Sequence, residues 1–217
     1  KSQKAKILNY SKESEQIIDK VIGKNKFDII NSSFVIHYLF KDDTSLKNML
    51  NNIKNHLAQD GYVLLTLFDS NQVMKLLDGN PSYTSYYTDS EGKKNKFFEI
   101  KKKFDGNPKN QTGNSIDVHM SWISNDENTY LEEYLVNKEF MISKMESIGL
   151  KLVETDLFEN IYKMNKEYFN TVIQYEENPG NKKFYEKIAE FFKELKGIDK
   201  EGKVWNFLSR FYVFQLV

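Results

Sequence analysis

Three side chains that can hold a flat ligand follow the first apolar run of the chain. Phe34, His37 and Tyr38 lie within five residues of one another, directly after the run at 27–32. If that run is a parallel strand, they lie where an α/β sheet binds its ligand, at the carboxyl end of the strand. The alternative is structural, with Phe34 and Tyr38 as core aromatics and His37 as a histidine satisfied at an interface. The residue types alone leave both interpretations open.

Several other chemistries find little support in the residue types. The chain has no cysteine, which excludes a disulfide framework, a thiolate zinc site and a cysteine nucleophile. His37, His56 and His119 are scattered without the spacing of metal ligands, so we predict no metal site. No Ser-His-Asp arrangement or phosphate-binding glycine loop is visible in the sequence.

The charges are balanced, which limits how an RNA could bind. Lysine plus arginine and aspartate plus glutamate number 31 each, so any RNA contact must be a local patch. Lys93, Lys94, Lys96 and the run 101–103 form a basic stretch that can hold a triphosphate or an RNA backbone. The other interpretation is that these lysines lie on a solvated strand face, where their charge prevents edge-to-edge pairing with another chain.

A strand, a helix and a second strand are expected first. Residues 27–32 have the length and branching of a buried parallel strand. Apolar residues then recur at helical spacing from Asp43 to Gln59, and Asp60-Gly61 is the expected end of that helix. Residues 62–68 read as a second central strand. Together these elements predict a βαβ unit of a doubly wound sheet.

Antiparallel strands are expected in the second half of the chain. Residues 96–104 and 115–122 alternate apolar and polar side chains on either side of a polar loop. The remaining expected elements are a helix at 69–77, a helix at 138–148 ending at Gly149, a strand at 150–155, helices at 165–175 and 181–195, and a last strand at 207–217. The order predicts one α/β domain, 1–217, with an antiparallel insertion and an antiparallel edge. No apolar run approaches the roughly 20 residues that cross a bilayer. We therefore expect an intracellular protein without membrane contact.

The run at 27–38 resembles the signature of cap guanine-N7 methyltransferases. It reads FDIINSSFVIHY, and in that family a strand of the form FDxV/I leads into a Q-F-x-x-H-Y turn. Three later segments resemble the family in the same order, namely GYVLLTLFDS at 61–70, EEYLV at 132–136 with the GLKLV strand at 149–153 and Phe158, and LSRFYVF at 208–214. The resemblance covers nearly the whole chain from Ile7, and is to the methyltransferase domain of large-DNA-virus capping enzymes. It implies a Rossmann-like class I S-adenosylmethionine-dependent methyltransferase core, S-adenosylmethionine as cofactor, and the 5' end of capped RNA as partner. It also implies a place in the cytoplasm (a viral factory or virion) or the nucleus.

The sequence departs from that family in its donor-binding motifs. A glycine-rich DxGxGxG turn is absent, Asn9-Tyr10 stands where the family has an Asp and a residue facing the adenine, and Ser33 replaces the Gln. We therefore expect an N-terminally incomplete core, with 1–80 as the end of the donor-binding sheet and 81–217 as the cap-binding insertion and closing strands. On this expectation the 217 residues alone bind S-adenosylmethionine weakly and expose an unpaired sheet edge.

The resemblance also implies roles for individual residues. His37 and Glu133 would approach the guanine edge, where a carboxylate accepts from N1–H and the exocyclic amine together. Phe34 and an aromatic of the last strand, Phe211 or Tyr212, would wall the base by stacking. No catalytic acid or base is expected, because guanine N7 carries a lone pair and proximity suffices. The candidates for donor contacts are Asn9, Tyr10, Ser33 and Tyr38.

Other functions stay open at this level. The first alternative is a non-catalytic methyltransferase-like subunit that binds and stimulates a capping enzyme, which missing donor motifs would permit. A second is methyl transfer to a small molecule on the same fold. Glu133 itself can be a solvated charge in the Glu132-Glu133 pair ahead of a strand. Other capping-enzyme domains are expected as further partners.

Overall fold

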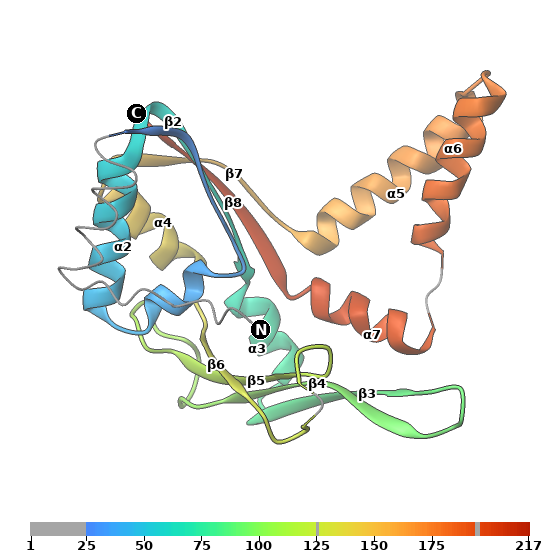
Figure 1. Cartoon of the computed structure of the whole chain (residues 1–217), viewed down its shortest axis with the longest axis horizontal. Helices are drawn as coiled ribbons and strands as arrows, with labels where there is room; N and C mark the ends of the chain where they lie inside the picture. The colour runs from blue at the N-terminus through green and yellow to red at the C-terminus, as the bar shows by residue number, and fades with distance from the viewer. Residues whose placement is uncertain (1–24, 125, 194–195) are drawn as a thin grey trace, which may run out of the picture.

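The chain folds into two four-stranded sheets joined by helices (Figure 1). The computed structural model describes residues 25–124, 126–193 and 196–217. The first sheet has the order β1-β2-β8-β7 and the second the order β3-β4-β5-β6. The strands are β1 (Phe27–Ser33), β2 (Leu57–Phe68), β3 (Ser82–Thr88), β4 (Lys94–Lys102), β5 (Ser115–Met120), β6 (Leu131–Tyr134), β7 (Leu150–Leu157) and β8 (Ser209–Leu216). The helices are η1 (Ile36–Phe40), α2 (Asp43–His56), α3 (Ser70–Leu77), α4 (Lys138–Glu146), α5 (Phe158–Tyr175), α6 (Pro179–Ala189), η2 (Glu190–Phe192) and α7 (Gly197–Asn206).

The predicted βαβ unit is present as β1, α2 and β2. β1 pairs with β2 in parallel, and the side chain of Asp42 caps α2 by accepting from the backbone N–H of Ser45 at 2.7 Å. The Asp60-Gly61 turn does not end the helix as expected, because α2 stops at His56 and β2 has already begun at Leu57. The turn instead forms an irregularity inside β2. The pairing there jumps from Phe27 opposite Leu57 to Ile29 opposite Tyr62, with Asp60 at a φ of 61°.

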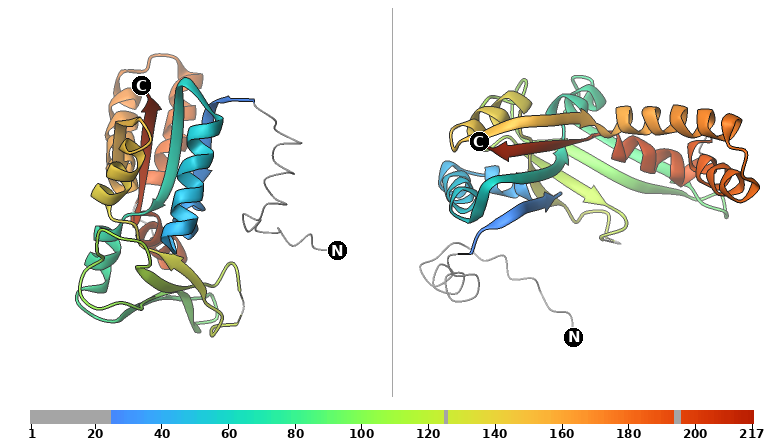
Figure 2. Two further views of the ribbon diagram at one scale, coloured as in Figure 1. Left: turned by 90° about the vertical axis from the view of Figure 1, so that its left-hand side faces the viewer. Right: turned by 90° about the horizontal axis from the view of Figure 1, so that it is seen from above.

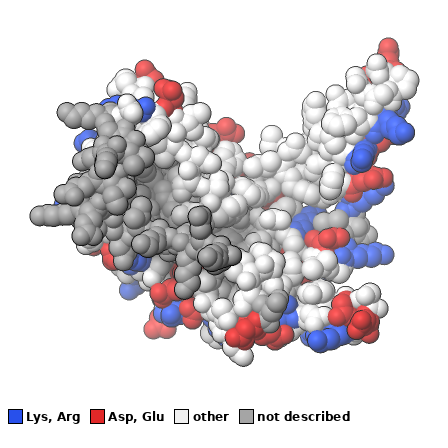
Figure 3. All heavy atoms as spheres, viewed as in Figure 1, with Lys and Arg blue, Asp and Glu red and all other residues white. Residues whose placement is uncertain are grey.

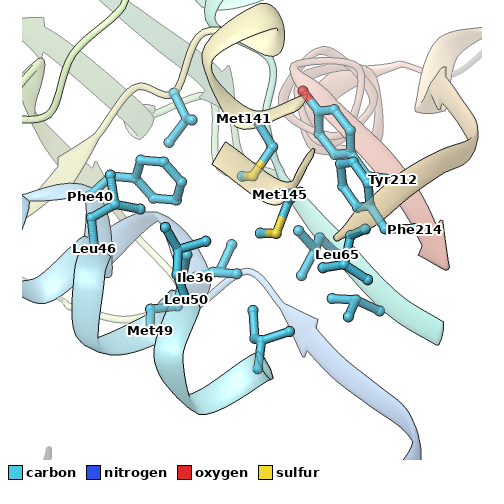
Figure 4. Close-up of a cluster of buried hydrophobic side chains, with 14 of the residues drawn as sticks. Ile36, Phe40, Leu46, Met49, Leu50, Leu65, Met141, Met145, Tyr212 and Phe214 are labelled. Atoms are coloured by element: carbon cyan, nitrogen blue, oxygen red, sulfur yellow. The ribbon is translucent and has the colours of Figure 1, made fainter. Parts of the chain in front are cut away.

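The last strand of the chain lies inside the first sheet. β8 pairs antiparallel with β2 on one side and with β7 on the other. Helices α2 and α4 cover one face of this sheet (Figure 1). Alternate residues of β8 point to opposite faces, so Tyr212 and Phe214 enter the core while Phe211 faces the other way. Figure 4 shows Tyr212 and Phe214 stacked beside Met141 and Met145 of α4.

The second sheet carries its own hydrophobic core. Its members come from β4 and β5, from α3, and from the segment before β8, including Phe98, Ile100, Val118, Val73 and Leu208. Two of its strands, β3 and β6, were not expected. The segment of β3 consists of serine, threonine and tyrosine, and β6 is four residues long, so neither has a clear apolar alternation.

Helices α5 and α6 form an arm that projects away from both sheets (Figures 1 and 2). We use the name "arm" for residues 158–189. α5 begins at Phe158, seven residues before the expected start, and no residue of α5, α6 or α7 is fully buried. α7, which was not expected, leads back from the arm toward β8 and lies above the second sheet in Figure 1. The arm and α7 therefore frame the side of the molecule onto which the candidate site opens.

Candidate active site

A pocket of about 290 Å³ lies where the two sheets meet. Its walls come from η1 after β1, from the end of β2, from β5 and β6 with the loop between them, and from α7. This is the position at which an α/β sheet presents a ligand, beyond the carboxyl ends of its parallel strands. The residues that line it are Phe34, His37, Tyr38, Phe68, Met120, Trp122, Ile123, Leu131, Glu133, Trp205 and Asn206.

A buried carboxylate is the central polar group of this pocket. The Glu133 side chain is 7% exposed, and its Oε1 accepts a hydrogen bond of 3.2 Å from the hydroxyl of Tyr38. Oε2 lies 3.2 Å from Nε2 of His37, although that contact is not aligned as a hydrogen bond. A carboxylate offers about four acceptor positions, so Glu133 retains acceptor capacity for a ligand.

His37 is buried beside the Glu133 carboxylate, and its two ring nitrogens lack hydrogen bonds. Neither Nδ1 nor Nε2 has a hydrogen-bond partner among the described residues, and the residue is 5% exposed. Its ring packs on that of Tyr38, with 4.2 Å between the centroids. Buried polar atoms without partners are uncommon in folded proteins and cost free energy, which identifies His37 as a group that a ligand can satisfy.

Tyr38 keeps its proton in this setting. Burial, the negative charge of Glu133 and the hydrogen bond to Glu133 raise the pKa of the Tyr38 hydroxyl to about 12. The neutral phenol therefore remains a donor over the whole range in which the protein is expected to work. Tyr38 fixes the orientation of the Glu133 carboxylate, because the shared hydrogen bond joins η1 to β6.

Phe34 occupies an unusual backbone conformation at the mouth of the pocket. Its φ is 56°, a region that bulky residues rarely adopt, and its N–H donates to the carbonyl of Thr66 at 2.8 Å. The ring is 46% exposed and meets that of Phe158 edge-on at 6.1 Å. Conformations of this kind cost free energy and gather at ligand sites, where they aim a side chain.

Both tryptophans of the chain line the pocket. Trp122 and Trp205 are the two tryptophans in the sequence, and their rings meet edge-on at 5.1 Å. Trp205 also packs edge-on against Phe68 at 4.9 Å. We did not predict Trp122, Trp205 or Phe68 as site residues. The signal in the sequence was that its two tryptophans are rare, large side chains suited to stacking. Because they are 83 positions apart, the sequence did not indicate that they form a pair.

Three other candidate residues lie elsewhere in the described structure, and two fall outside it. Tyr212 is 2% exposed in the core of the first sheet, and Phe211 lies on the opposite face of β8; neither lines the pocket. Ser33 is exposed at the end of β1, where its hydroxyl lies 3.3 Å from Oδ1 of Asn31. Asn9 and Tyr10 lie outside the described residues. The last strand, from which a second aromatic wall was expected, thus brings no aromatic ring to this pocket, whereas α7 brings Trp205.

Half of the basic stretch around β4 is neutralised by neighbouring carboxylates. Lys96 and Lys101 both pair with the buried Glu99, at 2.8 and 3.4 Å, and Lys103 pairs with Asp117 and Glu132. Burial alone would raise the pKa of Glu99, but hydrogen bonds from Lys96 and Tyr130 and the lysine charges lower it to about 2. These lysines therefore stabilise the second sheet. Among the described residues, the members of the stretch without such an ion pair are Lys93, Lys94 and Lys102.

Metal-binding clusters and membrane-spanning helices are both absent from the described ranges 25–124, 126–193 and 196–217. No cluster of three or more histidine, aspartate or glutamate side chains there has the geometry of a metal site. In the same ranges no helix combines the length and the apolar character needed to span a membrane.

Comparison with known protein families decides which family this chain belongs to. Residues 4–202 match the mRNA (guanine-N(7))-methyltransferase domain. The chain belongs to this family. The family and the α/β methyltransferase fold class predicted from the sequence are therefore confirmed. Within this guanine-N7 methyltransferase domain, the matched region contains Phe34, His37, Tyr38 and Glu133.

The relatives of this methyltransferase domain include viral capping enzymes. A probable mRNA-capping enzyme of Acanthamoeba polyphaga mimivirus is 39% identical over 213 residues, which is 93% of this chain and 18% of that protein. The mRNA-capping enzyme of African swine fever virus (strain Badajoz 1971 Vero-adapted) is 27% identical over 152 residues, 69% of this chain and 17% of that protein. The chain thus spans about a fifth of the length of these relatives.

Solved structures of methyltransferases overlap with the chain in part. An S-adenosylmethionine-dependent methyltransferase from Clostridium acetobutylicum has a TM-score of 0.42 at 13% identity, covering 88% of this chain and 59% of that one. A putative S-adenosylmethionine-dependent methyltransferase from Listeria monocytogenes has a TM-score of 0.40 at 12% identity, covering 88% of this chain and 62% of that one.

Proposed function

We propose that this domain binds the guanine of an RNA cap in the pocket around Glu133 and positions its N7 for methylation. The observation that carries the proposal is the buried Glu133 carboxylate, held by Tyr38 and facing a pocket walled by aromatic rings. Methyl transfer to the 5' cap guanine is the activity that fits both this pocket and the family.

Glu133 accounts for the choice of base. The Watson–Crick edge of guanine presents N1–H and an exocyclic amine side by side, and one carboxylate can accept from both. Adenine has an acceptor at N1, which would face the negative charge without a proton between them. A site built around hydrogen bonds rejects a base that leaves its buried polar groups unpaired, often by several orders of magnitude.

Phe34 and Trp205 are proposed as the two walls of the base site. Both line the pocket and come from different elements, one after β1 and the other from α7. Stacking of a base on an aromatic side chain contributes about 1–3 kcal/mol. His37 is proposed to use Nδ1, the ring nitrogen that does not lie against Glu133, to satisfy a polar group of the purine or its ribose.

The chemistry that remains is orientation rather than proton transfer. Guanine N7 has a lone pair and no proton, so no general base is required, and holding N7 in line with a methyl carbon can supply several kcal/mol of the barrier. S-Adenosylmethionine supplies the methyl group when it is bound. Ser33, exposed at the carboxyl end of β1, and Tyr38 in η1 are the proposed donor contacts among the described residues.

The wider setting is also a proposal. The long viral relatives support a domain that works beside other capping activities, on capped RNA inside an infected or host cell. The predicted division into a donor-binding part, 1–80, and a cap-binding part, 81–217, belongs to the same proposal. The pocket draws on both parts, since Phe34 and His37 come from the first and Glu133 from the second.

The direct test uses modified caps. The full-length protein is incubated with labelled S-adenosylmethionine and RNA capped with guanosine or with 7-deazaguanosine, and the digested cap is identified by chromatography. We expect N7-methylated product from the guanosine cap only, while the 7-deaza cap, whose Watson–Crick edge is intact, competes as an inhibitor of similar affinity. Methyl groups found on a ribose hydroxyl, or a 7-deaza cap that does not compete, would overturn the proposal.

A further inference from the structure

A second, larger hollow of about 960 Å³ opens beside the guanine pocket. It lies between the base of the arm, η2, α7 and β4, and Trp122 and Asn206 line both spaces. We call it the aromatic groove. Six aromatic side chains line it, namely Phe97, Trp122, Phe158, Tyr162, Phe191 and Phe207. Uncharged side chains also predominate on the face of the arm seen in Figure 3, with charged ones toward its outer edge.

Aromatic rings connect the pocket to the groove without interruption. Phe34 of the pocket meets Phe158 of the groove edge-on at 6.1 Å, and Trp122, which borders both, lies 4.9 Å from Phe97. A ligand that leaves the pocket past either contact therefore passes from one aromatic surface to the next. The groove is not a closed core, because Phe191 is 74% exposed and Ile198 45% exposed.

We propose that the aromatic groove binds the first transcribed nucleotides of the capped RNA by stacking their bases. This inference rests on the proposed binding of the cap guanine in the neighbouring pocket. A cap guanine is joined through a triphosphate to the next nucleotide, so a substrate RNA must continue past the rim of the pocket. Aromatic side chains hold bases of any sequence, because every base has a flat π-face.

The charges of the groove determine how the RNA is held. Glu190 and Asp199 line it together with a single ammonium, that of Lys203, which lies 4.2 Å above the ring of Tyr162. The groove therefore does not attract phosphate strongly, and its share of the binding must come from stacking. The extra affinity contributed by these nucleotides should change little with salt, unlike phosphate contacts, which weaken steeply as salt rises.

The test compares ligands of increasing length on the full-length protein. Guanosine triphosphate, a cap dinucleotide and a capped oligonucleotide with 2-aminopurine as its first transcribed base are titrated at low and high salt. We expect the capped oligonucleotide to bind at least about fivefold more tightly than guanosine triphosphate, with 2-aminopurine fluorescence quenched on binding. The advantage should persist at high salt.

Two exposed aromatic residues provide a matched pair of variants. Phe191→Ala should remove most of the advantage and the quenching, while leaving the affinity for guanosine triphosphate unchanged. Tyr175→Ala, which truncates a side chain that is 77% exposed on the arm and does not line the groove, should have no effect. Phe191→Trp should restore the advantage.

The outcomes separate this inference from the function on which it rests. No preference for guanine nucleotides would contradict the guanine pocket itself. The groove proposal alone would be overturned if guanine binding were intact but no tighter for the longer RNA, or if 2-aminopurine were not quenched. The apolar surface of the groove would then be a binding site for a protein segment. An equal loss of affinity for both ligands in Phe191→Ala would overturn it as well.

Discussion

The hydroxyl of Tyr38 and the carboxylate of Glu133 are joined by a 3.2 Å hydrogen bond across 95 positions of sequence. The bond connects η1, which follows the first parallel strand, to β6 at the edge of the second sheet. This hydrogen bond lines the pocket and joins elements of the two sheets. The proposed recognition of guanine would therefore depend on how the sheets are held together.

Tyr38→Phe tests that dependence. The variant keeps the ring and removes the hydroxyl, so Glu133 loses its fixed orientation, and we expect guanine affinity to fall by about 1 kcal/mol, roughly fivefold. Tyr134→Phe is the control, since the Tyr134 hydroxyl makes a similar 3.0 Å hydrogen bond to the exposed Glu132. Calorimetric titration with guanosine triphosphate measures both. Equal effects of the two substitutions would refute a specific role for Tyr38.

Phe34→Leu tests the exposed wall of the base site. We expect a loss of about 1–3 kcal/mol in guanine nucleotide affinity, with a thermal melt close to that of the unaltered protein because the ring is 46% exposed. Phe27→Leu, on β1 at a similar exposure of 43%, serves as the control and should not change binding. If Phe34→Leu lowered the melting temperature without changing affinity, its ring would be structural.

Trp205→Leu tests the second proposed wall of the base site. The test has to separate stacking on the base from the packing of Trp205 within the protein. Trp205 contacts Phe68 and Phe98, so the variant should lose stability as well as guanine affinity. Trp205→Phe retains a stacking face and should recover most of the affinity even where it recovers little of the stability. Affinities that follow the melting temperatures of the two variants would show that Trp205 acts through packing.

The Glu99 cluster should make the second sheet sensitive to acid. The pKa of Glu99 is lowered from 4.5 to about 2 in the folded protein, so its contribution to stability is complete above about pH 4.5. As the pH falls toward 2, the unfolded chain binds the proton first and this contribution is lost. In denaturant titrations between about pH 4.5 and 2, the free energy of unfolding should fall less steeply for Glu99→Gln than for the unaltered protein. Parallel curves for the two proteins would contradict the assignment.

The sequence predicted the elements whose residue patterns are local. The apolar run of β1 and the helical spacing of α2 led to the βαβ unit and placed Phe34, His37 and Tyr38 at its ligand-binding end. The resemblance to a known family added Glu133, which lines the same pocket. Trp205 was not predicted as a pocket residue because it lies in α7, a helix with no fully buried residue. Only tertiary packing stabilises such a helix, so its sequence carries no clear local pattern.

Strand alternation bears on why the last strand brings no aromatic ring to the pocket. Phe211 and Tyr212 are adjacent in β8, so they must face opposite sides of the first sheet, and Tyr212 stacks 5.9 Å from Phe214 in the core. Matching residue types along the last strand could not decide which face opens on the pocket. That choice depends on where α2 and α4 pack, and these helices occupy the face of Tyr212.

The central claim is that Glu133 reads the Watson–Crick edge of guanine, and one titration series tests it most directly. Guanosine, inosine and adenosine triphosphates are titrated into the unaltered full-length protein and into two variants, Glu133→Gln and Glu132→Gln. Glu132→Gln is the control, because the Glu132 carboxylate lies on the exposed face of β6. We predict affinity in the order guanosine, inosine, adenosine, because inosine keeps N1–H but lacks the amine. Glu133→Gln should lose about 1.5–3 kcal/mol for guanosine and level the series, while Glu132→Gln should not. Equal affinity of the unaltered protein for guanosine and adenosine triphosphates, or a series unchanged by Glu133→Gln, would contradict the claim.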